Sequence, residues 1–128
     1  MAELTPRQAR VFQEPNDAVV ATLRADGSPQ TTVVWVDWDG EVVHFNTTLA
    51  REKTRNLRRD PRISITVIDP SGPYRHVTVE GLAELDEEGA NEHLNQMARK
   101  YTGEDFGDAP GRVIVRVRPL RVRSNNIE

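Results

Sequence analysis

Basic side chains are concentrated in one short stretch of the 128-residue chain, between Arg51 and Arg62. This stretch holds six Lys or Arg against two Asp or Glu, a local charge of +4 in a protein of net charge −3. The remaining 11 basic and 18 acidic residues therefore sum to −7. An acidic protein that gathers cations in one segment typically binds an anion there. The alternative is a solvated basic face that Glu52 and Asp60 partly neutralise.

The residues on either side predict that this stretch is helical. Thr47 and Thr48 are of the type that caps helix N-termini, and Pro61 is of the type that ends a helix. We therefore expect a helix over residues 49–60. Arg51 and Lys53 would lie in its first turn, where cations oppose the helix dipole. A phosphate at the exposed N–H groups would resolve this conflict, because amide donors, dipole and side-chain charge would all be directed at it.

Other chemistries find little support in the sequence. There is no cysteine, so disulfides, thiolate metal sites and cysteine nucleophiles are excluded. His44, His76 and His93 are far apart, and none has the spacing of a metal-ligand cluster, so we expect no metal site. No Ser or Thr stands in a nucleophile motif, no Gly-rich phosphate loop occurs, and no catalytic residue can be named. An anion site without an evident acid, base or nucleophile suits a protein whose chemistry resides in a phosphorylated cofactor.

Two tryptophans and the basic helix leave further readings open. Trp35 and Trp38 could stack on a planar ligand, although large aromatic residues in a strand more often belong to a core or a dimer interface. Nucleic-acid binding through the basic helix is a third hypothesis. It is disfavoured because the chain is acidic, poor in aromatic residues, and does not interleave its tryptophans with Lys or Arg. We therefore expect a small-molecule ligand and no nucleic acid.

The elements that must position these residues read as strands with helices between them. Two segments beyond the basic stretch have helical patterns, one from Pro6 to the residue before Pro15 and one over residues 86–101. Asp26-Gly27 and Asp39-Gly40 are hairpin signals, so the first three strands should form an antiparallel meander. Gly81 and Ala83 indicate a bend or a close backbone approach. Six segments have strand patterns: residues 17–25, 30–38, 41–46, 63–68, 76–85 and 112–123.

This order predicts a mainly β fold with α-helices, a six-stranded antiparallel barrel with peripheral helices, since closure removes exposed sheet edges. The length predicts a single domain over residues 1–128. Such a chain has little surface left to enclose a large ligand, so a second subunit should complete the site. No long apolar run occurs at the start, so we expect no signal peptide and no membrane span, and a cytoplasmic location.

Four segments in this order resemble the split-barrel flavin and deazaflavin oxidoreductases, the relatives of pyridoxamine 5′-phosphate oxidase. The resemblance runs from about Ala18 to Val122 and is most similar to the branch that uses the 5-deazaflavin coenzyme F420. Its most specific part is the run Lys-Thr-Arg-Asn-Leu-Arg-Arg-Asp-Pro that begins at residue 53. The other segments are Asp-Gly-Ser-Pro-Gln from residue 26, Trp-Val-Asp-Trp-Asp-Gly from residue 35 and Val-Glu-Gly-Leu-Ala from residue 79.

The resemblance implies a six-stranded split β-barrel homodimer with two cofactor sites at the subunit interface. It implies that the cofactor phosphate lies against the basic helix and its ring system along the second strand. Backbone amides of that strand would tune the ring. The residues to which it assigns cofactor binding are Gln30, Thr31, Thr32, Val33, Val34, Asn46, Thr47, Thr48, Arg51, Lys53, Thr54 and Arg55.

Three functions are consistent with this resemblance. The first is a reductase that passes a hydride from reduced coenzyme F420 to a small-molecule acceptor, with solvent as the proton donor. The second is an FMN-dependent oxidoreductase like pyridoxamine 5′-phosphate oxidase. The third is a protein that binds a flavin or deazaflavin without turnover. Acceptor specificity would lie in the loops around residues 70–75 and 102–111, and we expect the second of these, which is polar, to be mobile.

Overall fold

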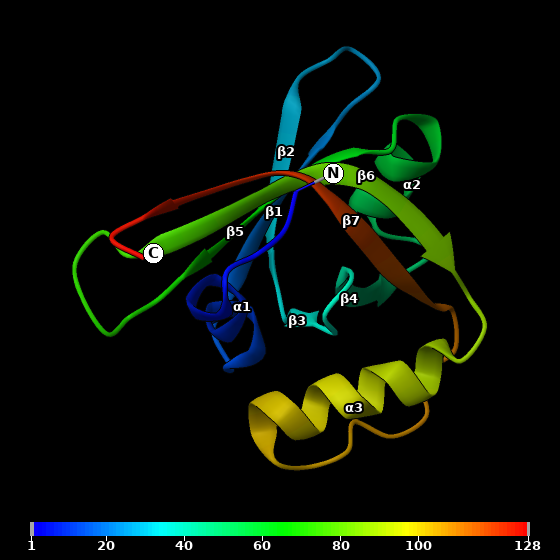
Figure 1. Ribbon diagram of the computed structural model, residues 1–128. Helices are drawn as coiled ribbons and strands as arrows, with labels where there is room; N and C mark the ends of the chain where they lie inside the picture. The colour runs from blue at the N-terminus through cyan, green and yellow to red at the C-terminus, as the bar shows by residue number, and fades with distance from the viewer. Residues whose placement is uncertain (1, 128) are drawn as a thin grey trace.

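The computed structural model describes residues 2–127 and contains one curled antiparallel sheet with three helices at its periphery (Figure 1). The helices are α1 (Pro6–Gln13), α2 (Glu52–Arg59) and α3 (Ala90–Thr102). None of the helices in the described part of the chain is long and apolar enough to cross a membrane. The strands are β1 (Ala18–Leu23), β2 (Pro29–Val34), β3 (Asp37–Trp38), β4 (Val43–Thr48), β5 (Arg62–Ile68), β6 (His76–Asp86) and β7 (Arg112–Asn125).

The order of the strands across the sheet explains why the sheet closes. This order is β2-β1-β5-β6-β7-β4-β3. The two edge strands, β2 and β3, are consecutive in the chain, and only Trp35 and Val36 separate them. Three residue steps span at most about 11 Å, so the edges must come together at this point. The sheet therefore curls into a split barrel, as the sequence predicts.

The predicted strand over residues 30–38 is in fact two strands, so the sheet has seven strands instead of six. β2 pairs with β1, whereas β3 pairs with β4 on the opposite edge. Both predicted hairpins exist, but they lie at the two ends of the sheet and do not form one meander. The meander prediction was wrong because closing the barrel requires the chain to leave one edge and join the other within this segment.

The backbone groups released at this break are hydrogen-bonded by α3. Val36 is fully buried, and its N–H and C=O have no strand partner, which would be costly without compensation. The Tyr101 hydroxyl accepts from the Val36 N–H at 3.0 Å and donates to the Asn16 carbonyl at 2.5 Å. The Lys100 ammonium donates to the Val36 carbonyl at 2.6 Å and to the Phe12 carbonyl at 2.7 Å. The end of α3 thus fastens the barrel at its closing point.

The core fills the inside of the curled sheet with alternating side chains of the central strands. Phe12 of α1 and Phe45 of β4 are its largest fully buried members. The intervening positions of β5, from Arg62 to Ile68, are exposed or half-buried, so one face of that strand is buried and the other is accessible. The central strands contribute the fully or almost fully buried residues Ile63, Ile65, Val67, Val77, Val79, Val113, Val115 and Val117.

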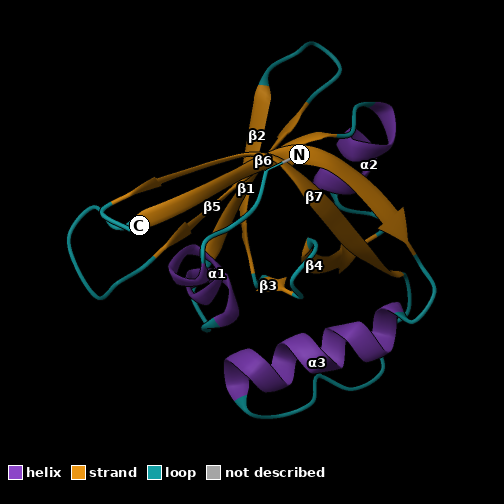
Figure 2. Cartoon of the chain, viewed as in Figure 1, coloured by secondary structure: helices purple, strands orange, loops and turns teal. Residues whose placement is uncertain are grey.

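Gly81 marks the predicted close approach of backbone. A register shift between β6 and β7 falls at Glu80 and Gly81, and a Cβ atom at Gly81 would lie 2.5 Å from the Arg118 carbonyl oxygen. Only glycine fits beside that backbone without a shift of the strands. The irregularity bends the long β6–β7 ribbon that curves around the barrel (Figure 2).

The helices begin and end close to their predicted limits, with two exceptions. α1 has the expected start, since Thr5 forms a capping box with Gln8. The predicted caps Thr47 and Thr48 were wrong, because both residues remain paired with β7 and Arg51 is the N-cap of α2. β-branched residues favour the extended backbone of a strand, which here continues to Thr48. α3 starts at Ala90 instead of residue 86, since β6 extends through Asp86.

We expect Tyr101→Phe to destabilise the protein by about 1–3 kcal/mol, the usual cost of leaving a buried polar group without its partner. The phenyl ring would keep the stacking on Trp35, where the ring centroids are 5.3 Å apart, so the loss reports the hydroxyl alone. Tyr74→Phe is the matched control, because Tyr74 is 82% exposed. Urea unfolding gives the free energy of unfolding of both variants. Equal values would show that the Tyr101 hydroxyl does not stabilise the break between β2 and β3.

Candidate functional site

A cavity of about 490 Å³ opens beside the basic helix. Its walls come from β2, β4, the start of α2, α3, the loop that follows α3 and the first residue of β7. In Figure 1, α2 and α3 lie on either side of β4. The volume falls in the usual range of roughly 300–1,000 Å³ for small-molecule sites. The residues that line it are Asp17, Thr32, Val33, Val34, Trp35, Asn46, Thr47, Thr48, Arg51, Lys53, Leu94, Met97, Phe106 and Arg112.

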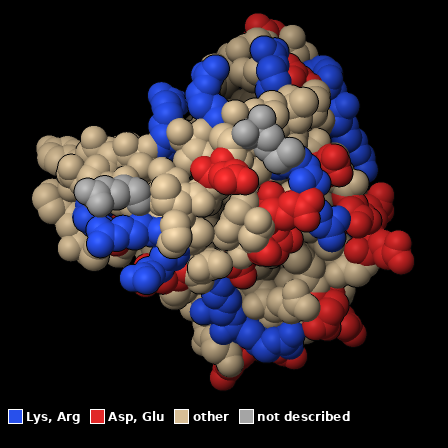
Figure 3. Space-filling view, in the orientation of Figure 1, with Lys and Arg blue, Asp and Glu red and all other residues tan. Residues whose placement is uncertain are grey.

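Helix α2 has two faces with different roles. Thr54, Asn56 and Leu57 are buried against the sheet, and the Thr54 hydroxyl donates to the Thr48 carbonyl at 2.6 Å. This packing fixes the rotation of the helix and leaves Lys53 only 5% exposed beside the cavity. The opposite face is solvated. Figure 3 shows Lys and Arg side chains along the upper-right edge, over α2, whose exposed cations are Arg55, Arg58 and Arg59. The solvated basic face is therefore present on one side of α2, and the predicted anion site would lie on the other, where Lys53 borders the cavity.

Three cations, Arg51, Lys53 and Arg112, line the same cavity. Within the described residues the Lys53 ammonium has no hydrogen-bond or ion-pair partner. Burial, followed by repulsion from Arg51 and Arg112, lowers the pKa of Lys53 below its usual value. Burial and the charge of Arg51 likewise lower the pKa of Arg112. Lys53 is the buried member of this cluster, Arg112 is half-buried and Arg51 is exposed. A buried cation without a partner is costly, and an anion bound beside Lys53 would offset that cost.

A hydroxyl group of β2 adds a further polar side chain to the lining of the cavity. The Thr32 Oγ1 atom is buried, lines the cavity through β2 and has no hydrogen-bond partner among the described residues. Buried polar atoms are rarely left without a partner, and those that are often face a ligand or water. Apolar side chains of Val34, Leu94 and Met97 border the same space. The cavity thus combines a cationic end with apolar side chains and with the polar side chains of Thr32, Asn46, Thr47 and Thr48.

The structure places the predicted site residues in two groups. Eight of them line the cavity, and four do not. Of the four, the Gln30 side chain accepts a hydrogen bond from Thr22, and the Thr54 hydroxyl is used within the fold. Thr31 and Arg55 are exposed, and Arg55 donates to the Ala50 carbonyl. The eight that line it are Thr32, Val33, Val34, Asn46, Thr47, Thr48, Arg51 and Lys53.

Several lining residues lie outside the predicted set. Arg112 comes from the start of β7, and no motif marks it in the sequence. Leu94 and Met97 belong to the apolar stripe of α3, which predicts a buried face but not a ligand.

Two of the histidines, His44 and His93, are far apart in the sequence but in contact in the structure, with Nδ1 of His44 2.8 Å from Nε2 of His93. No group of three or more potential metal ligands occurs within residues 2–127.

The loop between α3 and β7 is tied to α3. The Asn95 side-chain oxygen accepts from the backbone N–H groups of Phe106 and Gly107 at 2.7 and 2.9 Å. The Asn91 side chain accepts from the Ala109 N–H and donates to the Gly107 carbonyl, both at 2.8 Å. This loop was expected to be mobile, but the two asparagines give it a defined path. Phe106, 59% exposed, is thereby held at the mouth of the cavity.

A phosphorylated ring cofactor fits this arrangement. The unpartnered Lys53 ammonium and its cationic neighbours would hold a phosphate, and the unpartnered Thr32 hydroxyl would meet a polar edge of a ring. Val34, Leu94 and Met97 offer apolar contact for such a ring. The donor set is wrong for a metal-centred cofactor, because cations and hydroxyls dominate it.

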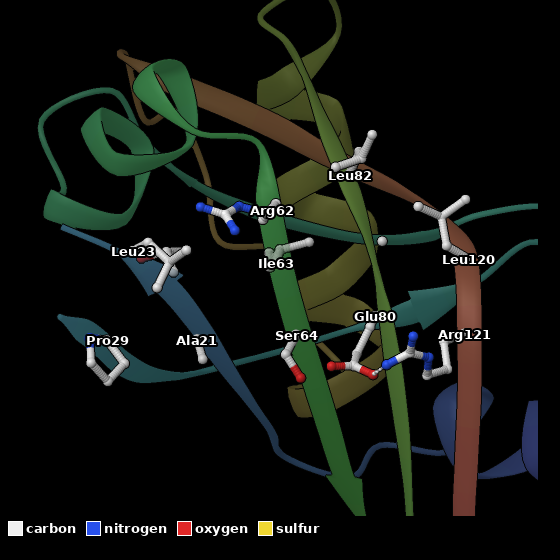
Figure 4. Close-up of a pocket in the computed structure, with 12 residues that line it drawn as sticks. Ala21, Leu23, Pro29, Arg62, Ile63, Ser64, Glu80, Leu82, Leu120 and Arg121 are labelled. Atoms are coloured by element: carbon white, nitrogen blue, oxygen red, sulfur yellow. Dashed lines mark ion pairs between the residues drawn. The ribbon is translucent and has the colours of Figure 1, made fainter. Parts of the chain in front are cut away.

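A second depression lies on the outer face of the sheet. This outer groove has a volume of about 430 Å³ and runs across β1, β5, β6 and β7. Figure 4 shows Leu23, Ile63, Leu82 and Leu120 on these strands, with the Glu80–Arg121 ion pair between β6 and β7. Leu82 and Leu120 are about half exposed, at 48% and 54%. No group of the cationic cavity lines this groove, so it is a separate surface.

Solved structures with the same fold are numerous. An F420 reductase is 32% identical, with 94% of this chain and 98% of that chain covered and a TM-score of 0.85. A conserved hypothetical protein from Mycobacterium tuberculosis is 31% identical, with 97% and 84% covered and a TM-score of 0.73. General Stress Protein 26 from Bacillus anthracis str. Sterne shares the fold at 18% identity, with 95% and 93% covered and a TM-score of 0.75.

The family model described as "Pyridoxamine 5'-phosphate oxidase" matches residues 4–126, which is almost the whole chain. Its match spans every strand that lines the cavity and the whole basic helix. Together with the seven-stranded curled sheet and the cationic cavity beside α2, this match shows that the chain belongs to the pyridoxamine 5′-phosphate oxidase family of flavin-binding split-barrel oxidoreductases.

Proposed function

We propose that the protein is a reductase that uses the deazaflavin coenzyme F420. The observation that carries the proposal is the cluster of Arg51, Lys53 and Arg112, in which a buried lysine has no partner within the fold. A phosphate would neutralise such a cluster, and the chain belongs to a family of flavin-binding oxidoreductases. The 32% identity to an F420 reductase over 94% of the chain favours the deazaflavin over FMN.

In this proposal the residues of the chain bind and orient, and the cofactor reacts. The reduced deazaflavin supplies a hydride. Lys53, Arg51 and Arg112 hold its phosphate, while Thr32 donates to or accepts from a polar edge of the ring. Apolar side chains of α3 exclude water from one side of the ring. Among the described residues that line the cavity there is no histidine or tyrosine, and Asp17 is the one carboxyl group. A carboxyl group is ordinarily ionised at neutral pH, so in this proposal solvent donates the proton to the reduced acceptor.

The same observation favours FMN as the second candidate cofactor. A phosphate-binding cluster does not distinguish the two compounds, and the family model that matches residues 4–126 is described as an oxidase of pyridoxamine 5′-phosphate. An FMN-dependent oxidoreductase would use the same cations and the same strand.

We expect Lys53→Ala to weaken cofactor binding far more than it changes folding. Loss of one charge-assisted contact should cost about 1.5–3 kcal/mol of binding free energy, which raises Kd roughly 10- to 150-fold. The free energy of unfolding should stay constant or rise, because the substitution removes a desolvated cation that Arg51 and Arg112 repel. Isothermal titration calorimetry with coenzyme F420 and urea unfolding measure the two quantities.

Arg58→Ala is the matched control for this substitution. Arg58 lies on the same helix, is exposed and does not line the cavity, so its removal should change Kd less than about threefold. Normal binding by Lys53→Ala, or an equal loss in both variants, would place the phosphate elsewhere on the protein.

We expect coenzyme F420 to bind about tenfold or more tightly than FMN, which corresponds to roughly 1.4 kcal/mol. Parallel titration of the purified protein with both compounds tests this preference. Equal affinities, or a yellow protein that copurifies with FMN, would favour the FMN-dependent oxidoreductase. Tight binding of F420 without reduction of any acceptor in a panel of enones would favour a binding protein without turnover.

We further propose a homodimer whose interface completes the cofactor sites, with the outer groove as an additional contact between the two subunits. The cavity is open, and Val33 in its wall is 64% exposed, so one chain alone leaves a ring cofactor partly in water. The outer groove offers half-exposed leucines beside both charge signs, with Arg62 and Arg121 near Glu80. A surface with both signs and an apolar centre can complement a second copy of itself.

Light scattering at micromolar concentration should therefore give the mass of a dimer. Leu82→Glu should shift the protein toward the monomer, since a carboxylate would enter the apolar part of the groove. Because Leu82 is 48% exposed, this change should leave the fold of each subunit intact by circular dichroism. A wild-type protein that is monomeric with cofactor tightly bound would refute the dimer, and a dimeric Leu82→Glu variant would refute the groove as its contact.

A further inference from the structure

Behind the cationic cavity lies a chain of hydrogen-bonded side chains from three different elements. It starts at Arg112 of β7, whose Nε donates to the Asn46 side-chain oxygen at 2.7 Å. Asn46 of β4 then contacts His93 of α3, with Nδ2 of Asn46 2.9 Å from Nδ1 of His93. His93 contacts His44 of β4 at 2.8 Å. Arg112 and Asn46 line the cavity, whereas His93 and His44 do not.

The orientation of the Asn46 amide is fixed from two sides. A guanidinium can only donate, so the Asn46 atom that faces Arg112 must be the carbonyl oxygen. The Nδ2 group must then face the Ala90 backbone carbonyl, which can only accept, at 2.8 Å. A flipped amide would lose both hydrogen bonds and place like dipoles against each other. The amide therefore presents an N–H, and only an N–H, to His93.

This orientation determines the protonation of His93. Because Asn46 donates, Nδ1 of His93 must accept and carry no proton. The ring proton then lies on Nε2, which donates to Nδ1 of His44. A doubly protonated His93 would direct an N–H at the Asn46 amide group and disrupt the contact. The network requires the neutral imidazole with one defined tautomer.

Burial and the surrounding charges favour that neutral form. His93 is 8% exposed, and burial, with smaller effects of His44 and Arg116, lowers its pKa to about 4 against an opposing effect of Asp37. Burial lowers the pKa of His44 as well, while Asp37 and Asp39 act in the opposite direction and Lys100 and Arg116 add to the lowering. The charged groups that act on the two rings are thus Asp37 of β3, Asp39 after it, Lys100 of α3 and Arg116 of β7. At pH 7.5, above the usual pKa of histidine, the neutral form therefore predominates in both rings.

We propose that His93 is a positioning residue of the anion site, where its neutral Nδ1 accepts the second N–H of the Asn46 amide and so holds in place the carbonyl that binds Arg112 at the cavity. This inference rests on the proposed function, because it assumes that Arg112 contacts the phosphate of the cofactor. It assigns to α3 a role in phosphate binding through a residue that itself touches no ligand. Arg112 has no ion-pair partner among the described residues, so Asn46 is the side chain that restrains its guanidinium.

The test compares two substitutions that differ in one acceptor atom. His93→Leu removes the acceptor, and we expect it to raise the Kd for coenzyme F420 about 5- to 10-fold, the effect of one poorly held charged contact. His93→Asn can place its side-chain oxygen near the position of Nδ1 and should bind within about twofold of wild type. Equilibrium dialysis measures Kd at pH 7.5, and circular dichroism checks that both variants are folded.

A double-mutant cycle separates positioning from a general structural effect. In an Arg112→Ala background, His93→Leu should have no further effect on Kd, because the residue it positions is gone. An equal loss in both backgrounds would overturn the proposal, and so would a folded His93→Asn variant as weak as His93→Leu. In wild type, ¹⁵N NMR at pH 7.5 should find the proton of His93 on Nε2, and a proton on Nδ1 would also overturn it.

The Lys53→Ala variant distinguishes a failure of the positioning role of His93 from a failure of the proposed function. If Lys53→Ala weakens binding while His93→Leu binds as wild type, the phosphate site stands and the positioning role of His93 is wrong. If neither Lys53→Ala nor Arg112→Ala changes Kd, the phosphate lies elsewhere and the proposed function fails together with the inference.

Discussion

The two-residue connection between the edge strands is the constraint on which the structure depends. Trp35 and Val36 carry the chain from one edge of the sheet to the other, and no wider separation of those edges is possible over so short a span. The break frees buried backbone groups, and Lys100 and Tyr101 of α3 bind them. Closing the barrel therefore also fixes α3 against it. The cavity follows directly, since β2, Trp35 and α3 form three of its sides.

The cationic cavity carries an electrostatic cost. Lys53 is placed at the cavity by the burial of Thr54 and Leu57 on the same helix, and within the described residues no acidic side chain of the helix pairs with it. A protein selected only for stability would carry an apolar residue at this position, because a buried cation without a partner loses hydration and gains nothing. An anionic ligand reverses this balance. The unfavourable contribution is electrostatic, and the packing of the core is unaffected.

Much of this could be predicted from local sequence. Asp26-Gly27, Asp39-Gly40 and Thr5-Pro6 each specify a turn or helix start by their own backbone preferences, and all three lie where expected. Gly81 likewise signalled the irregularity in β6. The failures involve partners distant in the sequence. Thr47 and Thr48 have the residue types of caps, but pairing with β7 keeps them in a strand. The split of residues 30–38 depends on which edges meet, and that is a property of the whole sheet.

The candidate site divides in the same way. Arg51 and Lys53 were predictable because an unusual charge density is visible in one short stretch. Arg112 was not, since it becomes part of the cluster only when β7 pairs with β4 and brings residue 112 opposite Thr48. The two asparagines that hold the loop before β7 were also invisible, because Asn91 and Asn95 look like ordinary polar positions of an amphipathic helix.

Helix α3 therefore determines the ligand-facing side of the cavity although its sequence shows only an apolar stripe. Its buried face supplies Leu94 and Met97, its polar face holds the loop that carries Phe106, and its last turn fastens the barrel break. The cationic end is built by α2, β4 and the first residue of β7, and α3 reaches it only through the contact of His93 with Asn46. Apart from His93, changes in α3 or its loop would therefore alter the apolar end of the cavity and leave the three cations in place. The basic stretch of α2 is visible in the sequence as a charge density, whereas the residues of α3 and its loop carry no comparable signal, which explains why the sequence reveals the cationic end more readily than the apolar one.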